Sequence, residues 1–180
     1  MVMTTTRQEI RDVLMDPRGA GVKESYFTIF EEKNSFIPEE DHSVVVVSPG
    51  KNGVEFNKTD GYFNQYQEVL LLQCLYGQGI IVMQRGDGED NAKEFKVMTL
   101  HPGKQVAVPV GFGHSLVNIG KTFLVVLNNI GRTTKDSSKN QQAVSFKAKR
   151  GFAYYIVEKK GEVGFEQNPN YTIHPQISTE

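Results

Sequence analysis

The sequence predicts an all-β domain, folded as a sandwich or small barrel of about ten short strands. Glycine is frequent, at 17 of 180 residues, as in a chain with many turns. Turn signals such as Pro49-Gly50, Asn52-Gly53 and Pro102-Gly103 separate short apolar runs. These signals recur at roughly 8–12 residues, a spacing typical of sandwiches and barrels. The length suits a single domain.

The predicted strands are rich in β-branched and aromatic residues. They cover residues 26–30, 43–48, 54–57, 69–75, 79–84, 95–100, 105–109, 114–118, 123–128, 151–158 and 163–166. The unbroken valine run from Val44 to Val47 predicts a strand buried on both faces. The last two strands form a hairpin that turns at Lys160-Gly161. The polar stretch from Thr133 to Gln142 predicts a mobile loop.

One short helix is predicted near the N-terminus. Thr6 stands three residues before Glu9, which is the spacing of a capping box. Apolar residues follow at helical period, and Pro17 ends the pattern. We expect this helix to lie against the outside of the barrel. The chain then divides into an N-terminal helix and arm (1–22), a barrel (23–167) and a fraying polar tail (168–180).

Charge and composition exclude several classes of function. The formal net charge of −1 argues against a nucleic-acid or membrane-surface partner, since both favour a basic surface. Met1 to Gln8 lack the apolar segment of a signal peptide, and no apolar run reaches about 18 residues. We therefore expect a cytoplasmic protein. The single cysteine, Cys74, lies in an apolar run and is interpreted as a buried strand thiol.

Three stretches of the chain carry a family resemblance. Residues 109–120 read Pro-Val-Gly-Phe-Gly-His-Ser-Leu-Val-Asn-Ile-Gly, with the histidine at His114. Residues 49–61 and 149–170 complete the pattern. Together they resemble the cupin-type phosphoglucose isomerase (glucose-6-phosphate isomerase) family, from about Asp12 to Asn170. The resemblance implies a single cupin barrel, that is, a double-stranded β-helix or jelly roll, with a short N-terminal helix.

The resemblance also implies a metal inside the barrel, held by two histidines and a glutamate from a first motif and one histidine from a second. His114 matches the histidine of the second motif, and Thr59 and Gly61 match positions on the phosphate side of the site. The family's Gly-His-x-His, however, reads Gly61-Tyr62-Phe63-Asn64 here, so both histidines are replaced.

Other family positions also differ. The spacing of the family glutamate falls on Leu70, and Glu68, two residues earlier on the same strand face, takes its place only if the strand bulges. An active-site tyrosine reads Asn129, and a phosphate-contacting threonine reads Val45. A transition-metal site normally needs three or four good ligands. We therefore expect no cofactor; the alternative is a divalent metal (Mn, Fe, Ni or Zn) held by His114 and Glu68.

The candidate site follows from these matches. The catalytic candidates are Glu68 as a base and His114 as a donor, because aldose–ketose isomerisation moves a proton between adjacent carbons and stabilises an enediolate. The ligand-binding candidates are Thr59, Gly61, Tyr62, Asn64, Tyr66 and Asn129.

Three functions stay open from the sequence. The first is a sugar-phosphate isomerase with an altered active site. The second is a metal-free module that binds a sugar or a similar small molecule. The third is a repurposed enzyme with another substrate, using Glu68, His114, Tyr62 and Tyr66 as acid–base groups. The apolar run from Leu70 to Leu72 favours either a ligand less polar than a sugar phosphate or a structural core. A homodimer is also expected, with Val44 to Val47 in its interface or in the core.

Overall fold

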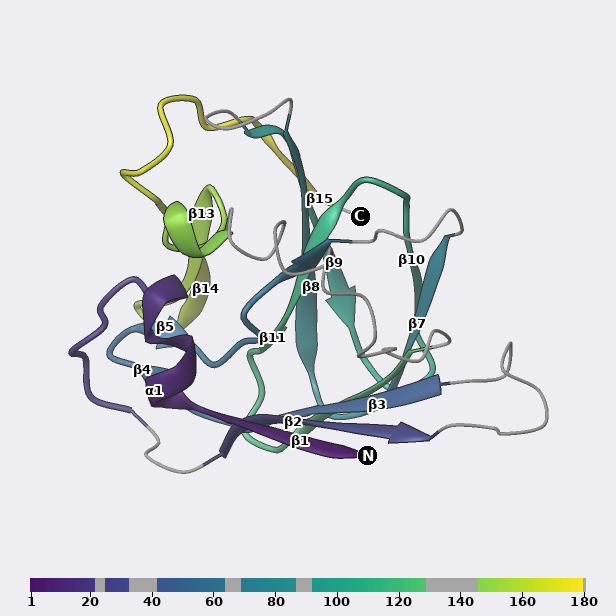
Figure 1. Cartoon of the computed structure of the whole chain (residues 1–180). Helices are drawn as coiled ribbons and strands as arrows, with labels where there is room; N and C mark the ends of the chain where they lie inside the picture. Colours follow the sequence, from purple (N-terminus) through teal and green to yellow (C-terminus); the bar gives the residue numbers. More distant parts are fainter. Residues whose placement is uncertain (22–24, 33–41, 64–68, 87–91, 129–145, 180) are drawn as a thin grey trace.

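The fold is described from a computed structural model, in which residues 1–21, 25–32, 42–63, 69–86, 92–128 and 146–179 are placed. These residues form three sheets around two apolar cores, and the helices are short. Figure 1 shows β1, β2 and β3 lying crosswise beneath β8, β9 and β11, with the smallest sheet and the helix α1 to one side. The chain is an all-β cupin barrel, as predicted.

The six-stranded sheet forms one wall of the barrel. In spatial order its strands are β1 (Val2–Thr6), β2 (Ser25–Glu32), β3 (His42–Val47), β12 (Leu124–Asn128), β7 (Leu70–Tyr76) and β10 (Gln105–Val108). All its strand pairs are antiparallel, so side chains alternate between the barrel interior and the outer face.

The other two sheets complete the molecule. The five-stranded sheet is the opposite wall, in the order β15 (Ile177–Thr179), β9 (Ala92–Leu100), β8 (Gly79–Gly86), β11 (Gly113–Asn118) and β6 (Tyr62–Phe63). The four-stranded sheet orders β14 (Glu162–Gln167), β13 (Tyr154–Lys159), β5 (Glu55–Phe56) and β4 (Lys51–Asn52). The predicted hairpin at Lys160-Gly161 is confirmed.

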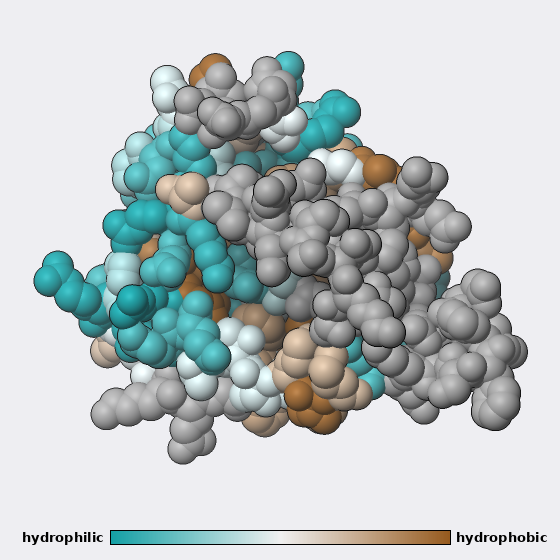
Figure 2. Space-filling view, in the orientation of Figure 1, coloured by the Kyte–Doolittle hydropathy of each residue, from teal (hydrophilic) through white to brown (hydrophobic). Residues whose placement is uncertain are grey.

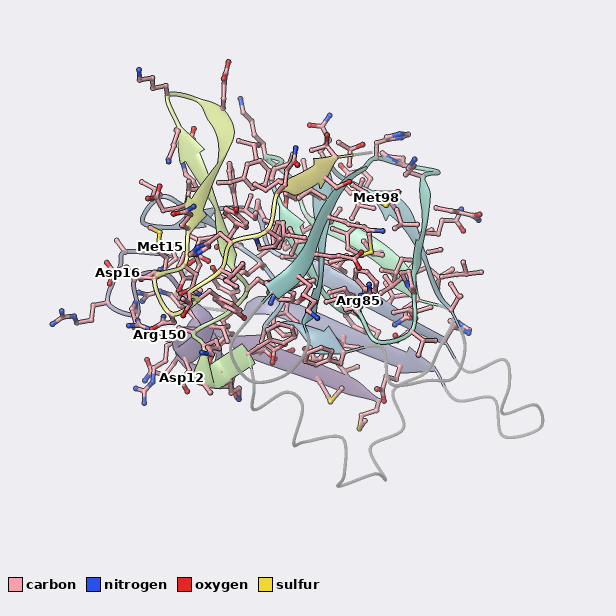
Figure 3. All side chains as sticks on the ribbon, turned by 90° about the horizontal axis from the view of Figure 1, so that it is seen from above. Asp12, Met15, Asp16, Arg85, Met98 and Arg150 are labelled. Atoms are coloured by element: carbon pink, nitrogen blue, oxygen red, sulfur yellow. The ribbon has the colours of Figure 1, made fainter. Side chains whose placement is uncertain are left out.

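The main core fills the space between the two larger sheets (Figure 3). The six-stranded sheet contributes Ile29, Val45 and Val126, and the five-stranded sheet contributes Ile81 and Leu116. A second core lies between the five-stranded and four-stranded sheets. Its members are buried apolar residues that include Ile80, Val82, Phe95, Phe152 and Ile156. The five-stranded sheet is thus covered on both faces.

At one end of the barrel, an asparagine side chain joins the two larger sheets. The Asn118 side-chain amide donates hydrogen bonds to the carbonyls of Val47 (2.9 Å) and Thr122 (2.8 Å), which binds the end of β11 to the end of β3. The polar side chains that point inward from the two larger sheets lie at the opposite end. We call that end the barrel mouth.

The N-terminal segment differs in part from its prediction. The capping box forms, because the Glu9 carboxylate accepts hydrogen bonds from both the Thr6 amide (2.7 Å) and the Thr6 hydroxyl (2.8 Å). The helix is one turn, α1 (Arg7–Ile10), followed by the 3-10 turn η1 (Arg11–Val13). The residues before it form β1, an edge strand on β2 that the sequence did not predict.

A buried ion pair attaches this segment to the four-stranded sheet. The Lys58 ammonium donates to Glu55 (2.6 Å) and to the Val13 carbonyl (2.7 Å). The second Glu55 oxygen accepts the Met15 amide (2.8 Å). Both charged side chains are buried, and each has partners that offset the loss of hydration.

Two other predictions were wrong. The valine run is not buried on both faces, because inward Val45 and Val47 alternate with half-buried Val44 and Val46 on the outer face of the sheet. The tail does not fray from Asn168, since Ile177–Thr179 pairs in parallel with β9 as β15. The predicted loop 133–142 lies outside the described residues. In the described part of the chain, no helix is long and apolar enough to cross a membrane.

Candidate functional site

His114 faces the interior of the barrel near its mouth. It lies on β11, is 8% exposed, and stands two residues before Leu116 of the main core, so both side chains share the inward face. The strand register pairs it with Tyr62 on β6 and Met83 on β8. The rings of His114 and Tyr62 have centroids 6.3 Å apart and planes inclined by 52°. The second-motif histidine therefore has an aromatic neighbour on one side and a thioether on the other.

The backbone around His114 is fixed by close packing behind the sheet. A Cβ atom on Gly113 would lie 2.3 Å from Phe146, so only glycine lets that ring pack against β11. Phe146 stacks on Phe63 (4.6 Å between centroids) and on Phe152 (4.1 Å). Because Phe63 packs outward, its neighbour Tyr62 points inward toward His114.

Thr59 and Gly61 are held in the structural frame of the site. The Thr59 hydroxyl accepts the Leu116 amide (3.1 Å), and the Ser115 hydroxyl donates to the Thr59 carbonyl (2.8 Å). Gly61 has φ of +95°, and a Cβ there would lie 2.7 Å from Phe152. These contacts attach the segment before β6 to β11. The ligand role of both residues stays a prediction.

Charged groups line the mouth on the five-stranded sheet. Arg85 forms an ion pair with Glu94, its cross-strand partner. The guanidinium of Arg85 lies 5.6 Å and the ammonium of Lys96 5.4 Å from the ring centroid of Phe112. Arg85 is two residues from Met83, and Lys96 is the cross-strand partner of Met83, so all three face the interior. Figure 3 shows Arg85 on the same pair of strands as Met98.

The six-stranded sheet offers a second polar row at the mouth. Glu31, Ser43 and Asn128 are cross-strand neighbours on β2, β3 and β12. Their side chains continue the inward series of Ile29 and Val45. Glu31 is 6% exposed and Ser43 is 1% exposed. Polar residues from both walls therefore gather at one end of an otherwise apolar barrel.

Several predicted site residues cannot be located. Asn64, Tyr66, Glu68 and Asn129 lie outside the described residues. The structure therefore brings together His114 and Tyr62 of the predicted set, with Thr59 and Gly61 directly behind them. Sequence reasoning missed Glu31, Ser43, Arg85 and Lys96. For Glu31 a signal existed, since it continues the period-2 series of Phe27 and Ile29.

The described residues do not fit the metal centre that the family implies. The cross-strand neighbours of His114 are a tyrosine and a methionine rather than imidazole or carboxylate groups. Across the described ranges, no three His, Cys, Asp or Glu residues cluster as a metal site needs.

Two expectations about the barrel lining have clear outcomes. Cys74 is a buried thiol, and burial raises its pKa, as suits an inert core residue. Leu70 and Leu72 point inward while Leu71 is half exposed on the outer face. The apolar lining inferred from this run is therefore real at two of its three positions.

Comparisons with known proteins agree with the resemblance. Residues 24–174 match the family model described as glucose-6-phosphate isomerase. The glucose-6-phosphate isomerase of Pyrococcus furiosus is 28% identical over 159 residues, covering 88% of this chain and 77% of that protein. That of Thermococcus litoralis is 27% identical over 153 residues, covering 84% and 73%. The Drosophila melanogaster CENP-C cupin domain aligns with a TM-score of 0.43 at 11% identity, over 64% of this chain and 77% of that one.

Proposed function

Since the chain belongs to the glucose-6-phosphate isomerase family, we propose that its barrel mouth binds a phosphorylated sugar and that it is an isomerase with an altered site. The observation that carries this proposal is the position of His114. It retains the second-motif position of the family and faces the barrel interior beside Tyr62. The cationic side chains of Arg85 and Lys96 at the same mouth suit the phosphate group.

The proposed chemistry needs a donor and a base. His114 donates a hydrogen bond to the carbonyl oxygen of the open-chain sugar and stabilises the negative charge that develops there. Glu68 is proposed as the base that takes the proton from C2 and returns it to C1, while the hydroxyl proton of O2 passes to O1 through His114, so that aldose and ketose balance. In this proposal the hydrogen bond from His114 takes the place of the Lewis acid that the family implies.

A second function is favoured by one observation. Tyr62, rather than a histidine, is the cross-strand neighbour of His114, and Met83 is the other neighbour. A site with these groups holds a polar ligand by hydrogen bonds and ring contacts without converting it to a product. The alternative is therefore a metal-free sugar-binding module.

One set of measurements separates the two functions. Purified protein is analysed for metal after chelation and after reloading with Mn, Fe, Ni or Zn. Glucose 6-phosphate binding is then measured by calorimetry, and isomerisation by product analysis. We expect binding and turnover without stoichiometric metal, both reduced at least about tenfold in His114→Ala, through loss of a charge-assisted donor. His101→Ala, at an exposed turn, is the matched control and leaves both unchanged.

Each result decides between the functions. Binding without turnover in any metal state supports the binding module and rejects the isomerase. Stoichiometric metal that disappears in His114→Ala overturns the metal-free mechanism. Absence of glucose 6-phosphate binding in the wild-type protein rejects both functions.

A further inference from the structure

We propose that the barrel mouth takes a ligand with an ammonium group, and that Glu31 binds this group. The inference rests on the proposed function, because it assumes that the mouth is the ligand site. It adds a residue outside the predicted set and a chemical class of ligand, an amino sugar phosphate.

The proposal rests first on the environment of the Glu31 carboxylate. Its side chain is 6% exposed, and neither carboxylate oxygen has a hydrogen-bond partner among the described residues. Its backbone carbonyl is satisfied by the amino group of Met1 (2.6 Å), so the strand itself is in place. A buried carboxylate without a partner is costly, and proteins normally pair such a charge. A cation that enters from outside the chain supplies the missing partner.

Glu55 shows how a structural carboxylate is paired elsewhere in this fold. Glu55 is fully buried, and its oxygens accept the Lys58 ammonium and the Met15 amide. A carboxylate that only supports the fold is thus provided with a cation and a backbone donor. The Glu31 carboxylate accepts a hydrogen bond from neither a cation nor a backbone amide of the described residues, although Glu31 belongs to a regular strand. The contrast indicates that its partner is a ligand.

The second ground is the neighbour of Glu31. Ser43 is its cross-strand partner, is 1% exposed, and its hydroxyl also lacks a hydrogen-bond partner among the described residues. Two adjacent buried polar groups on the inward face therefore have unused hydrogen-bonding capacity. A protonated amine has three donors, enough for a carboxylate and a hydroxyl together.

The sheet order brings this pair toward His114. Asn118 binds β11 to β3, and β6 is the strand beyond β11. Ser43, the cross-strand partner of Glu31, lies on β3, so the pair stands on the part of the six-stranded sheet that contacts the strand carrying His114. In Figure 1, β2 and β3 run beneath β11. The cations Arg85 and Lys96 belong to strands farther along the five-stranded sheet.

The mouth is thus polarised across its width. An unpaired carboxylate lies at one side, and at the other lie two cations that share one carboxylate, Glu94, which leaves a net positive charge there. A ligand that matches both carries an ammonium at one end and an anion at the other. An amino sugar phosphate has this charge pattern, whereas a simple sugar phosphate has only the anion.

The test compares two probes, glucosamine 6-phosphate and glucose 6-phosphate, by calorimetry at a pH where the amine is protonated. We expect wild-type protein to bind the amino probe at least about tenfold more tightly, as suits one charge-assisted hydrogen bond. Glu31→Gln, which keeps the shape and removes the charge, should reduce that preference to below about threefold. Glu166→Gln, in an exposed ion pair, is the control and keeps it.

A stability measurement accompanies the binding data. Glu31→Leu should raise the melting temperature, because it removes a buried charge that the fold does not pair. A fall in melting temperature would mean a structural carboxylate and would overturn the proposal. Equal affinity of wild-type protein for both probes would also overturn it while leaving the sugar-phosphate function intact. Binding of neither probe rejects both the inference and the proposed function.

Discussion

Gly61 sets the backbone path of the segment that leads into β6. Its φ of +95° is a conformation that other residues rarely adopt, and its Cα faces the ring of Phe152. This close contact with Phe152 accompanies the hydrogen bonds and strand pairing that attach the segment from Thr59 to Phe63 to β11. The family match at Gly61 therefore has a steric reason, independent of any ligand.

Replacing Gly61 by alanine should destabilise the fold by about 2–4 kcal/mol, the sum of left-handed strain and overpacking. Gly103→Ala is a matched control, since φ there is +88° but nothing lies within 4 Å of the new Cβ. It should cost only about 1–2 kcal/mol. Urea denaturation of both variants measures the difference, and equal losses would exclude the Phe152 contact as the cause.

Lys58 provides a second residue-level prediction. Lys58→Met leaves the Glu55 carboxylate buried with one partner fewer, so we expect a loss of about 3–5 kcal/mol in the free energy of unfolding. Lys159→Met breaks the exposed pair with Glu166 and should cost no more than about 1 kcal/mol. The same denaturation assay applies, and a small effect at Lys58 would contradict a structural role for the pair.

Residue roles were predictable only where a motif or a periodicity exposes them. His114 was found from its motif, and its inward direction follows from strand alternation with Leu116. Glu31 was missed because the predicted strand ended at Phe30, although β2 continues to Glu32. Arg85 and Lys96 resemble ordinary surface charges in sequence, and only the side-chain contacts of the folded chain show that both lie beside the ring of Phe112.

At the scale of elements, turn chemistry explains the success of the strand predictions. Strands with apolar or β-branched runs between glycine turns were predicted to within a few residues, and the β13–β14 hairpin turns where expected. The edge strands β1 and β15 were missed. β15 has three residues and pairs with β9, far away in the sequence, whereas β1 pairs with β2 on the other side of the short N-terminal helix. A single sequence carries little signal for such remote pairing.

The C-terminal strand β15 should protect the edge of β9. It pairs Ile177 with Phe95 and Thr179 with Val97. Ending the chain at Pro175 should therefore increase hydrogen exchange of β9 amides by at least about tenfold while leaving the β8–β11 pair protected. Hydrogen-exchange mass spectrometry checks this. Unchanged exchange in β9 would show that β15 adds no stability to that edge.

At the scale of the whole molecule, alkaline pH should weaken the fold. Burial raises the pKa of Tyr171 to about 12, and it also raises the pKa values of Tyr155 and Tyr26. A raised pKa in the folded state means that folding holds the proton more tightly. The stabilisation is therefore complete below about pH 10, the unfolded value, and is lost as pH rises toward 12.

Tyr171 should account for part of that loss, on the order of 2 kcal/mol. Its hydroxyl donates to the Gly151 carbonyl (2.9 Å) and accepts from Gln84 (3.2 Å). Urea denaturation between pH 8 and 11 should show a shallower alkaline decline in Tyr171→Phe than in the wild-type protein. Tyr76→Phe, at an exposed side chain, should retain the wild-type slope. Identical slopes in all three proteins would contradict the assignment.

The outer face of the six-stranded sheet carries an apolar row, and we propose that this row forms a homodimer interface. Phe30 is 44% exposed beside half-buried Val44 and Leu127, which continue its row on β3 and β12. Figure 2 shows apolar surface at the lower edge of the molecule, where β1 and β2 lie. Light scattering should give the dimer mass for the wild-type protein and the monomer mass for Phe30→Lys. Val163→Lys, on another sheet, should remain dimeric.

The bracing of the barrel at the end opposite its mouth has an evolutionary consequence. Asn118 joins the two larger sheets, and Lys58 with Glu55 fixes the N-terminal segment, yet neither contact uses a mouth side chain. Substitutions at the mouth can therefore accumulate under selection for a new ligand while the frame stays intact. Tyr62, which the resemblance aligns with a first-motif histidine, lies at such a position. Because the contacts that stabilise the barrel are separate from the mouth, its chemistry can change while every intermediate sequence still folds.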